Sequence, residues 1–270
     1  MRGVSHPTSL LIGDDRSGLP GIAHGGHVAG LLTEALGADA TRVRLRRPVP
    51  TAQPLQLIAP APGHVELYGA PELLAEAAAA EVVLDVPAPV SPAEAARAAE
   101  RAPAAARHPF PGCWCCGPAH PHGLGLLPGP VPGRRLVAAV WTPPAALADG
   151  DGTLPPAVVC AALDCPQLWA LMQHAPAASA ERVVTEVLET RLERPVRAGV
   201  PHVVMAWPIG RDGRRRLAGA AIVGPDGELC AAGRQTAVLV QGWGVPLGRD
   251  HWHAARAVAA PSARGAAVVP

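Results

Sequence analysis

The chain has 270 residues, which is long enough for two domains of ordinary size. An apolar fraction of 49% with a charged fraction of 17% indicates a globular protein and excludes an intrinsically disordered one. A net charge of +1 provides no overall field that would attract nucleic acid or an anionic membrane, so we expect neither as a partner.

The sequence carries no recognisable targeting or membrane segment. The apolar patch at residues 10–12 is followed almost at once by Asp14 and Asp15, which is not the pattern of a signal peptide. Every apolar run is interrupted before it reaches the roughly 18 residues that a transmembrane helix needs. The six cysteines are not spaced as a disulfide framework. We therefore expect a soluble, cytoplasmic protein.

The first predicted domain covers residues 1–86. After the glycine-rich segment GIAHGG, apolar periodicity predicts a helix over residues 27–36. The strand candidates that follow are rich in Val and Leu and are mostly bounded by Gly or Pro. They lie at residues 41–49, 54–60, 63–70 and 80–86.

A linker and a second domain follow. Residues 87–112 combine Pro with an Ala/Glu/Arg stretch, which predicts a connector with one short helix from about residue 92 to 101. In the second domain, residues 113–243, a strand precedes a long apolar helix that has Pro at its start. The later strands follow that helix, and the GPDG between the last two predicts a hairpin turn. These elements are a strand at 134–144, a helix at 155–172, and strands at 182–196, 202–210, 215–225 and 228–240, followed by a tail at 244–270.

The two halves repeat one order of elements, a helix followed by a run of antiparallel strands. Arg-Pro-Val closes the first strand after the helix in both, at residues 47–49 and 194–196. The tail strands of the two halves also match, with Glu-Leu at residues 72–73 corresponding to Glu-Leu at residues 228–229. Two copies of one unit are the simplest account. The sequence thus predicts an α+β fold in which each unit covers apolar surface left by the other, as a pseudo-dimer.

Short motifs in both halves resemble the double-hotdog acyl-CoA thioesterase II family, over roughly residues 8–86 and 106–241. The turn formed by His24, Gly25 and Gly26 is similar to the HGG that leads into the helix of many hotdog thioesterases. The resemblance implies two tandem hotdog domains, each a curved antiparallel sheet wrapped around a central apolar helix. It also implies that His24, Gly25 and Gly26 contact the substrate.

A second motif in the resemblance is a polar set in the second half. Asp164 lies on the central helix, Thr185 lies ten residues before Pro195, and Gln235 lies on the last strand. This order is similar to the Asp, Thr and Gln with which that family positions a hydrolytic water. The resemblance implies a hydrolase for acyl-CoA or related acyl thioesters, without a metal or other cofactor, with a homo-oligomer formed through the sheets as a further expectation.

The chemistry of thioester hydrolysis gives each residue type a role. Asp164 would anchor or deprotonate the water, and Thr185 and Gln235 would fix its direction by hydrogen bonds. Backbone amides after Gly25, at a helix start, would suit the oxyanion that forms, because helix N-termini carry free N–H groups and a positive dipole. Burial inside an apolar helix would raise the pKa of Asp164.

The first half lacks the same polar set. Nine residues after His24 stands Thr33, and the positions that match Thr185 and Gln235 hold Ala38 and Ala79. One active centre per chain is therefore expected, with Glu34 as a minor candidate for a second.

Each feature has a structural alternative. Asp164 could instead be the N-cap of a helix that begins at Cys165 and Pro166. The residues Asp149-Gly-Asp-Gly favour a turn over a calcium loop. The alternating arginines of residues 42–47 and those of residues 214–216 could grip coenzyme A phosphates, but a solvated strand face is the more common outcome.

The segment FPGCWCCGPAHPHGLGL contains a CxxC, formed by Cys113 and Cys116, with His120 and His122 shortly after it. A zinc knuckle is conceivable, but no second CxxC follows. The favoured interpretation is a Gly/Pro-rich loop whose thiols and Trp114 pack over the sheet, without metal.

Two alternative functions follow from these doubts. A catalytically inactive hotdog would bind an acyl ligand or a partner protein without hydrolysis. A hotdog dehydratase or hydratase would need a His beside the carboxylate, and the second half offers no obvious one.

Overall fold

The computed structural model describes residues 7–102, 108–174 and 182–240. The predicted tail at residues 244–270 and the linker residues 103–107 lie outside the described residues.

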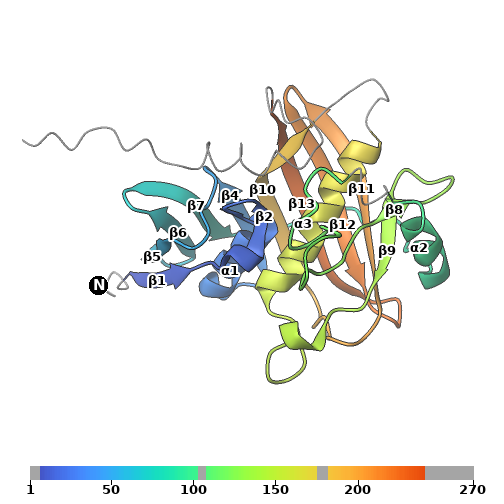
Figure 1. The fold of residues 1–270 in the computed structure, drawn as a ribbon, viewed down its shortest axis with the longest axis horizontal. Coiled ribbons are helices and arrows are strands. Elements are labelled where there is room, and N and C mark those ends of the chain that lie inside the picture. The colour runs from blue at the N-terminus through green and yellow to red at the C-terminus, as the bar shows by residue number, and fades with distance from the viewer. Residues whose placement is uncertain (1–6, 103–107, 175–181, 241–270) are drawn as a thin grey trace, which may run out of the picture.

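One antiparallel sheet of 11 strands forms the body of the protein (Figure 1), in the order β1-β5-β6-β7-β4-β10-β13-β12-β11-β9-β8. The strands from the first half are β1 (Thr8–Leu11), β4 (Ala40–Leu45), β5 (Pro54–Ala61), β6 (His64–Gly69) and β7 (Glu72–Ala79). Those from the second half are β8 (Gly129–Pro130), β9 (Val137–Trp141), β10 (Val183–Leu192), β11 (His202–Asp212), β12 (Arg215–Val223) and β13 (Leu229–Leu239).

The two halves of the sheet join where β4 pairs with β10. At the centre of this junction Glu189 lies opposite Arg42 and accepts hydrogen bonds from Arg42 and Arg234, both at 2.6 Å. The short strands β2 (Ser17–Leu19) and β3 (Ile22–Ala23) form a separate pair, and two 3-10 turns lie at Asp14–Arg16 and Ala145–Leu147.

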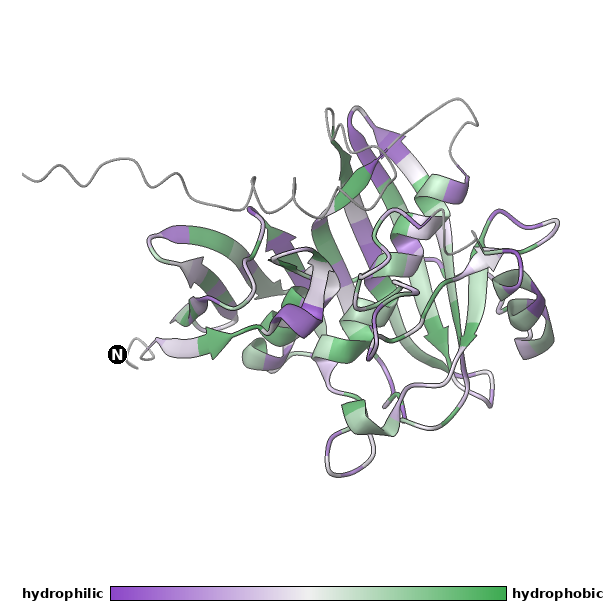
Figure 2. Ribbon diagram, viewed as in Figure 1, coloured by the Kyte–Doolittle hydropathy of each residue, from purple (hydrophilic) through white to green (hydrophobic). Residues whose placement is uncertain are grey.

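Two helices, α1 (Gly25–Leu36) and α3 (Pro156–Gln173), lie side by side against this sheet (Figure 1). Helix α1 packs over β4, β6 and β7, whereas α3 packs over β10 to β13. Helix α3 is buried along nearly its whole length, and Figure 2 shows it as largely hydrophobic. A helix that is apolar on all sides is expected where one face meets a sheet and another meets a second helix.

The close approach of the two helices depends on glycine. A Cβ atom at Gly26 would lie 2.6 Å from the backbone oxygen of Cys160 and 2.8 Å from the Cα of Ala161. One turn later, a Cβ at Gly30 would collide with the backbone of Ala157. The helix backbones therefore touch along this edge, which brings the start of α1 against the middle of α3.

The two halves repeat the same contacts at the residues matched in the sequence. Arg47 forms an ion pair with Glu72 at 3.7 Å, and Arg194 forms one with Glu228 at 3.1 Å. The backbone N–H groups of residues 46 and 47 donate to the carbonyl of Leu74, and those of residues 193 and 194 donate to that of Cys230. The repeat in the sequence thus corresponds to a repeat of local geometry.

Most predicted elements agree with the structure, including both central helices and the hairpin turn at residues 224–227. The Asp149 segment forms a turn, in which the N–H of Gly152 donates to the carbonyl of Asp149. The strand predicted at residues 80–86 was wrong, because the last strand of the first half is β7, eight residues earlier. Residues 80–86 instead run without strand pairing, and Val82 is buried.

The predicted short helix is α2 (Pro92–Ala99), at the edge of the molecule beside β8 and β9 (Figure 1). Ser91 and Glu94 form a capping box at its start. Ala95 and Ala98 are fully buried against strands of the second half. Among the described residues, no helix is both long and apolar enough to cross a membrane.

Candidate active site

Asp164 lies in the middle of α3 and is 2% exposed. The N-cap of this helix is Pro155, so the alternative interpretation of Asp164 as an N-cap was wrong. Pro166, which had suggested a helix start, is an interior residue of a helix held by core contacts on nearly every side. Asp164 is thus a carboxyl group carried into the core by a continuous helix.

Thr185 and Gln235 both contact Asp164. The Thr185 hydroxyl donates to Oδ1 of Asp164 at 2.7 Å, and the Gln235 side-chain amide donates to the same oxygen. The Gln235 amide also lies 3.0 Å from the Thr185 hydroxyl oxygen. Neighbouring strands β10 and β13 carry the two partners, and their pairing is irregular just after Thr185. Three residues up to 71 positions apart therefore form one hydrogen-bonded cluster.

The start of α1 completes this cluster from the other half of the chain. The backbone N–H of Gly26 donates to Oδ2 of Asp164 at 2.7 Å. A Cβ at Gly25 would lie 3.3 Å from the same carboxylate oxygen and 3.6 Å from the Cβ of Thr185. The Gly25 N–H occupies the first turn of α1, where amides have no partner within the helix, and it has none among the described residues.

His24 is the N-cap of α1, because its Nδ1 accepts a hydrogen bond from the N–H of His27 at 3.3 Å. Its side chain is buried, with Nδ1 3.7 Å from Oδ2 of Asp164 and Nε2 3.1 Å from Sγ of Cys165. Asp164 therefore has the glycine turn on one side and a histidine on the other.

Burial raises the pKa of Asp164 above its ordinary value, against the opposing effects of His24, Thr185 and the Gly26 amide. For His27, burial together with the nearby charges of His24 and Arg16 lowers the pKa to about 4. His27 is therefore neutral near pH 7, and its ring packs against Trp114.

A surface pocket of about 280 Å³ reaches this cluster through Thr185. Thr185 is half-buried, whereas Asp164 and Gln235 lie behind it in the core. Leu45 also lines the pocket and lies close to Gly25, since a Cβ there would be 3.1 Å from its Cδ1. The lining residues are Arg44, Leu45, Arg46, Val184, Thr185, Glu186 and Val238.

Two buried amide groups near Asp164 have unused hydrogen-bonding capacity among the described residues. Oε1 of Gln235 accepts no hydrogen bond there. Gln167 is fully buried on α3, and both its Oε1 and its Nε2 lack a partner. Gln167 belongs to none of the sequence motifs, although its position three residues after Asp164 places it on the same side of the helix.

The first half does not assemble an equivalent cluster. Thr33 lies nine residues after His24, the N-cap of α1, just as Asp164 lies nine residues after Pro155, the N-cap of α3. The Thr33 hydroxyl forms a hydrogen bond of 2.7 Å with the hydroxyl of Thr41. Ala38 and Ala79 offer no polar side chain. Glu34 is exposed on α1, so the structure does not bring it into a second centre.

Most of the arginines that could have gripped phosphates are engaged in ion pairs. Arg42 pairs with Glu189, Arg46 with Glu76, and both Arg44 and Arg215 with Glu186. This arrangement agrees with the more common interpretation, a charged strand face.

No protein-family model and no curated protein sequence matches the chain. Solved structures do resemble it. An acyl-CoA thioesterase II, TesB2, from Mycobacterium marinum has 16% identity and a TM-score of 0.54, over 82% of this chain and 90% of that one. The TesB protein of Mycobacterium avium subsp. paratuberculosis has 13% identity and a TM-score of 0.53, over 82% and 88%.

A third similar structure is a conserved protein with a hotdog fold from Alicyclobacillus acidocaldarius. It has 13% identity and a TM-score of 0.56, over 89% of this chain and 96% of that one. The fold of this protein is therefore the hotdog α+β fold. Within that class, its structural resemblance to TesB-type acyl-CoA thioesterases II extends over most of the chain.

Proposed function

We propose that the chain consists of two tandem hotdog units, residues 1–86 and 113–243, joined by the segment 87–112. The repeated ion pairs of Arg47 and Arg194 with Glu72 and Glu228 support this division. The pairing of β4 with β10 joins the two units into one sheet. The candidate site lies where the helix of the first unit begins against the helix of the second.

We further propose that the protein hydrolyses acyl thioesters, with acyl-CoA as the main class. The observation that carries this proposal is the hydrogen-bonded cluster of Asp164, Thr185 and Gln235 beside the start of α1. A thioester hydrolase needs a group that takes a proton from water, groups that orient the water, and a donor for the oxyanion. Each requirement has a candidate within this cluster.

The free acceptor sites define how a water would be held. A carboxylate offers about four lone-pair sites, and Asp164 uses three for Thr185, Gln235 and the Gly26 amide. Its remaining site can accept one hydrogen of a water, and Oε1 of Gln235 can accept the other. A water held by both hydrogens directs a lone pair outward, toward a bound carbonyl carbon.

The reaction then follows from these positions. The water oxygen forms a bond to the thioester carbon while Asp164 takes the water's proton, and the carbonyl oxygen becomes an oxyanion. The N–H of Gly25 has no partner among the described residues and lies at the positive end of α1, so it would stabilise that oxyanion. Collapse of the intermediate breaks the C–S bond, and the proton on Asp164 passes to the departing thiolate. The products are a carboxylic acid and a free thiol.

His24 has a supporting role in this scheme. Its side chain is buried behind the glycine turn and caps α1. We propose that it shapes the backbone that Gly25 and Gly26 present to the substrate.

Substrate would approach Asp164 from the pocket at Thr185. Ligand sites are typically 300–1,000 Å³, so a pocket of about 280 Å³ would hold the reacting thioester and only part of the acyl or pantetheine chain. The acyl-CoA name of the Mycobacterium marinum structure supports the same substrate class.

The purified protein should be tested with acyl-CoAs of increasing chain length, with release of free thiol as the readout. We expect turnover of at least one length class. Binding without turnover, seen as a rise in melting temperature, would favour the alternative of a hotdog protein that holds an acyl ligand. The absence of both would remove acyl-CoA as the ligand class.

A further inference from the structure

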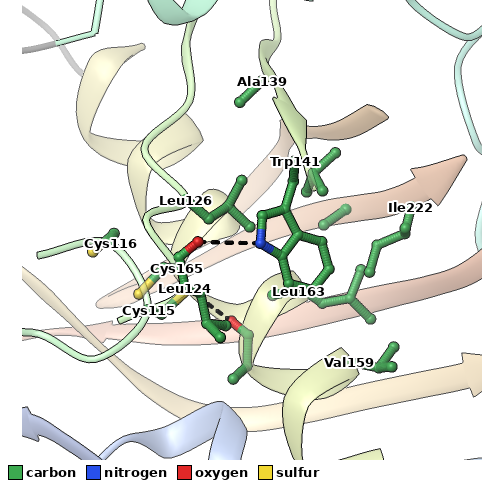
Figure 3. Packing of buried hydrophobic residues seen from close by; sticks show 14 of the residues in the cluster. Cys115, Cys116, Leu124, Leu126, Ala139, Trp141, Val159, Leu163, Cys165 and Ile222 are labelled. Carbon is green, nitrogen blue, oxygen red and sulfur yellow. Dashed lines mark hydrogen bonds between the residues drawn. The ribbon is translucent and has the colours of Figure 1, made fainter. Parts of the chain in front are cut away.

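The loop of residues 113–116, CWCC, meets two residues that lie far away in the sequence. Sγ of Cys113 is 3.8 Å from Sγ of Cys165 on α3, and Nε2 of His24 is 3.1 Å from the same sulfur. The ligand atoms of Cys113, Cys116 and Cys165 lie within 4.8 Å of one another, as do those of His24, Cys115 and Cys165. All five residues are buried (Figure 3 shows Cys115, Cys116 and Cys165).

We propose that Cys113, Cys116, Cys165 and His24 bind one structural Zn²⁺ ion. Structural zinc sites are closed and tetrahedral, with four Cys or His ligands, and a pair of cysteines separated by two residues is a common ligand spacing. With Zn–S bonds of about 2.3 Å, tetrahedral geometry places two sulfurs about 3.8 Å apart, as for Cys113 and Cys165. Cys165 belongs to both groups of converging ligand atoms, so it links the CxxC pair to His24.

The choice of His24 over Cys115 rests on their other contacts. The Cys115 thiol donates to the backbone oxygen of Ala161 at 3.2 Å, which satisfies it as a protonated thiol. Nε2 of His24 faces sulfur. Zinc on Nε2 would break the 3.3 Å hydrogen bond that the N–H of His27 donates to Nδ1, because the ring proton would then lie on Nδ1. Oδ2 of Asp164 lies 3.7 Å from that nitrogen. A ligating histidine whose second nitrogen faces a carboxylate is a recurrent arrangement around zinc.

The cysteines are available as ligands. All of the cysteines are free rather than disulfide-linked. Soft thiolate donors favour zinc over harder divalent ions such as Mg²⁺.

The site would hold three separate segments together. Cys113 and Cys116 belong to the loop after the linker, Cys165 to α3, and His24 to the N-cap of α1. Cys165 is next to Asp164 and His24 is next to Gly25, so the ion would fix both sides of the candidate active site. The proposal does not depend on hydrolysis, because a structural zinc would serve a binding protein equally well.

The first test is the metal content of protein purified under reducing conditions without chelator. We expect one zinc per chain by mass spectrometry of the metal. Cys113→Ser and Cys165→Ser should lose it, whereas Cys230→Ser, a matched change of a buried cysteine on β13, should retain it. Cys115→Ser should also retain it, and loss of zinc from that variant would overturn the choice of His24.

The second test needs no variant and therefore does not depend on whether a variant folds. Metal-free wild-type protein is titrated with Co²⁺, which should give intense visible bands of tetrahedral cobalt and thiolate charge-transfer bands with a stoichiometry of one. Zn²⁺ should displace the cobalt and raise the melting temperature. Wild-type protein that contains no zinc and gives no cobalt–thiolate spectrum, or whose Cys113 is in a disulfide, would overturn the proposal.

Discussion

The backbone N–H of Gly26 donates to Oδ2 of Asp164 across 2.7 Å, and so joins the first turn of α1 to the middle of α3. Residues 138 positions apart in the chain share this bond. The candidate site is therefore a property of both halves together, although its three polar side chains all belong to the second.

Gly26→Ala should destabilise the protein and displace Asp164. The added methyl would lie 2.6 Å from both the Cβ of Asp164 and the backbone oxygen of Cys160. Overpacking of this kind costs about 1–3 kcal/mol. Gly210→Ala is a suitable control, because a Cβ there meets nothing within 4 Å. Urea denaturation should show a lower midpoint for Gly26→Ala alone, and equal midpoints would contradict the close helix contact.

Thr185→Val should lower kcat while the fold is preserved. The substitution keeps the shape of the side chain but removes the hydroxyl that donates to Asp164 at 2.7 Å. A hydrogen bond to a charged group is worth about 1.5–3 kcal/mol, which corresponds to a decrease of roughly 10- to 150-fold if the bond persists in the transition state. Thr185→Ser retains the hydroxyl and should retain most of the activity. If valine and serine gave the same rate, the hydroxyl would have no such role.

Glu189 should make stability depend on pH at the junction of β4 and β10. Burial alone would raise its pKa, but hydrogen bonds and charges from Arg234 and Arg42 lower it overall. A lowered carboxyl pKa contributes stability that is present above the ordinary pKa of about 4.3 and is lost as the pH falls through the folded-state value.

Glu189→Gln should therefore lower the free energy of unfolding by about 1 kcal/mol at pH 7. The effect is modest because Arg42 and Arg234 are themselves half exposed, so solvent screens their charges. The difference from wild type should shrink as the pH is lowered below 4. Denaturation series at pH 7 and at acidic pH would check this, and a difference that grew in acid would contradict the sign.

Part of this candidate site could be predicted from the sequence, because patterns within single segments indicated the central helix and the polar residues. The order and spacing of Asp164, Thr185 and Gln235 resembled a known set, and the run of apolar residues before Asp164 predicted a helix that continues past it. The long-range partners could not be predicted in this way. No local pattern shows that the Gly26 amide would reach Asp164, or that Gln167 would be buried without a partner among the described residues.

The error in the fold has a similar origin. Residues 72–79, ELLAEAAA, are rich in residues that favour helices, yet they form β7 because strands β6 and β4 pair with them on both sides. The Val-rich residues 80–86 have a composition more typical of a strand. In the structure, however, Leu84 and Val86 pack against a different apolar cluster, near α2. Likewise, the sequence suggested His120 and His122 as neighbours of the CxxC. Both lie toward the surface, and Cys165 and His24 occupy that position instead.

The most direct test of the proposed hydrolase is the comparison of Asp164→Asn with wild type on the best acyl-CoA substrate. Thr33→Ser, at the matching position of α1, serves as the control. Loss of a general base typically costs 10²- to 10⁴-fold, so we predict that kcat falls at least about a hundredfold for Asp164→Asn, with an unchanged circular dichroism spectrum and with Thr33→Ser close to wild type. Turnover by a folded Asp164→Asn variant at the wild-type rate would contradict the account.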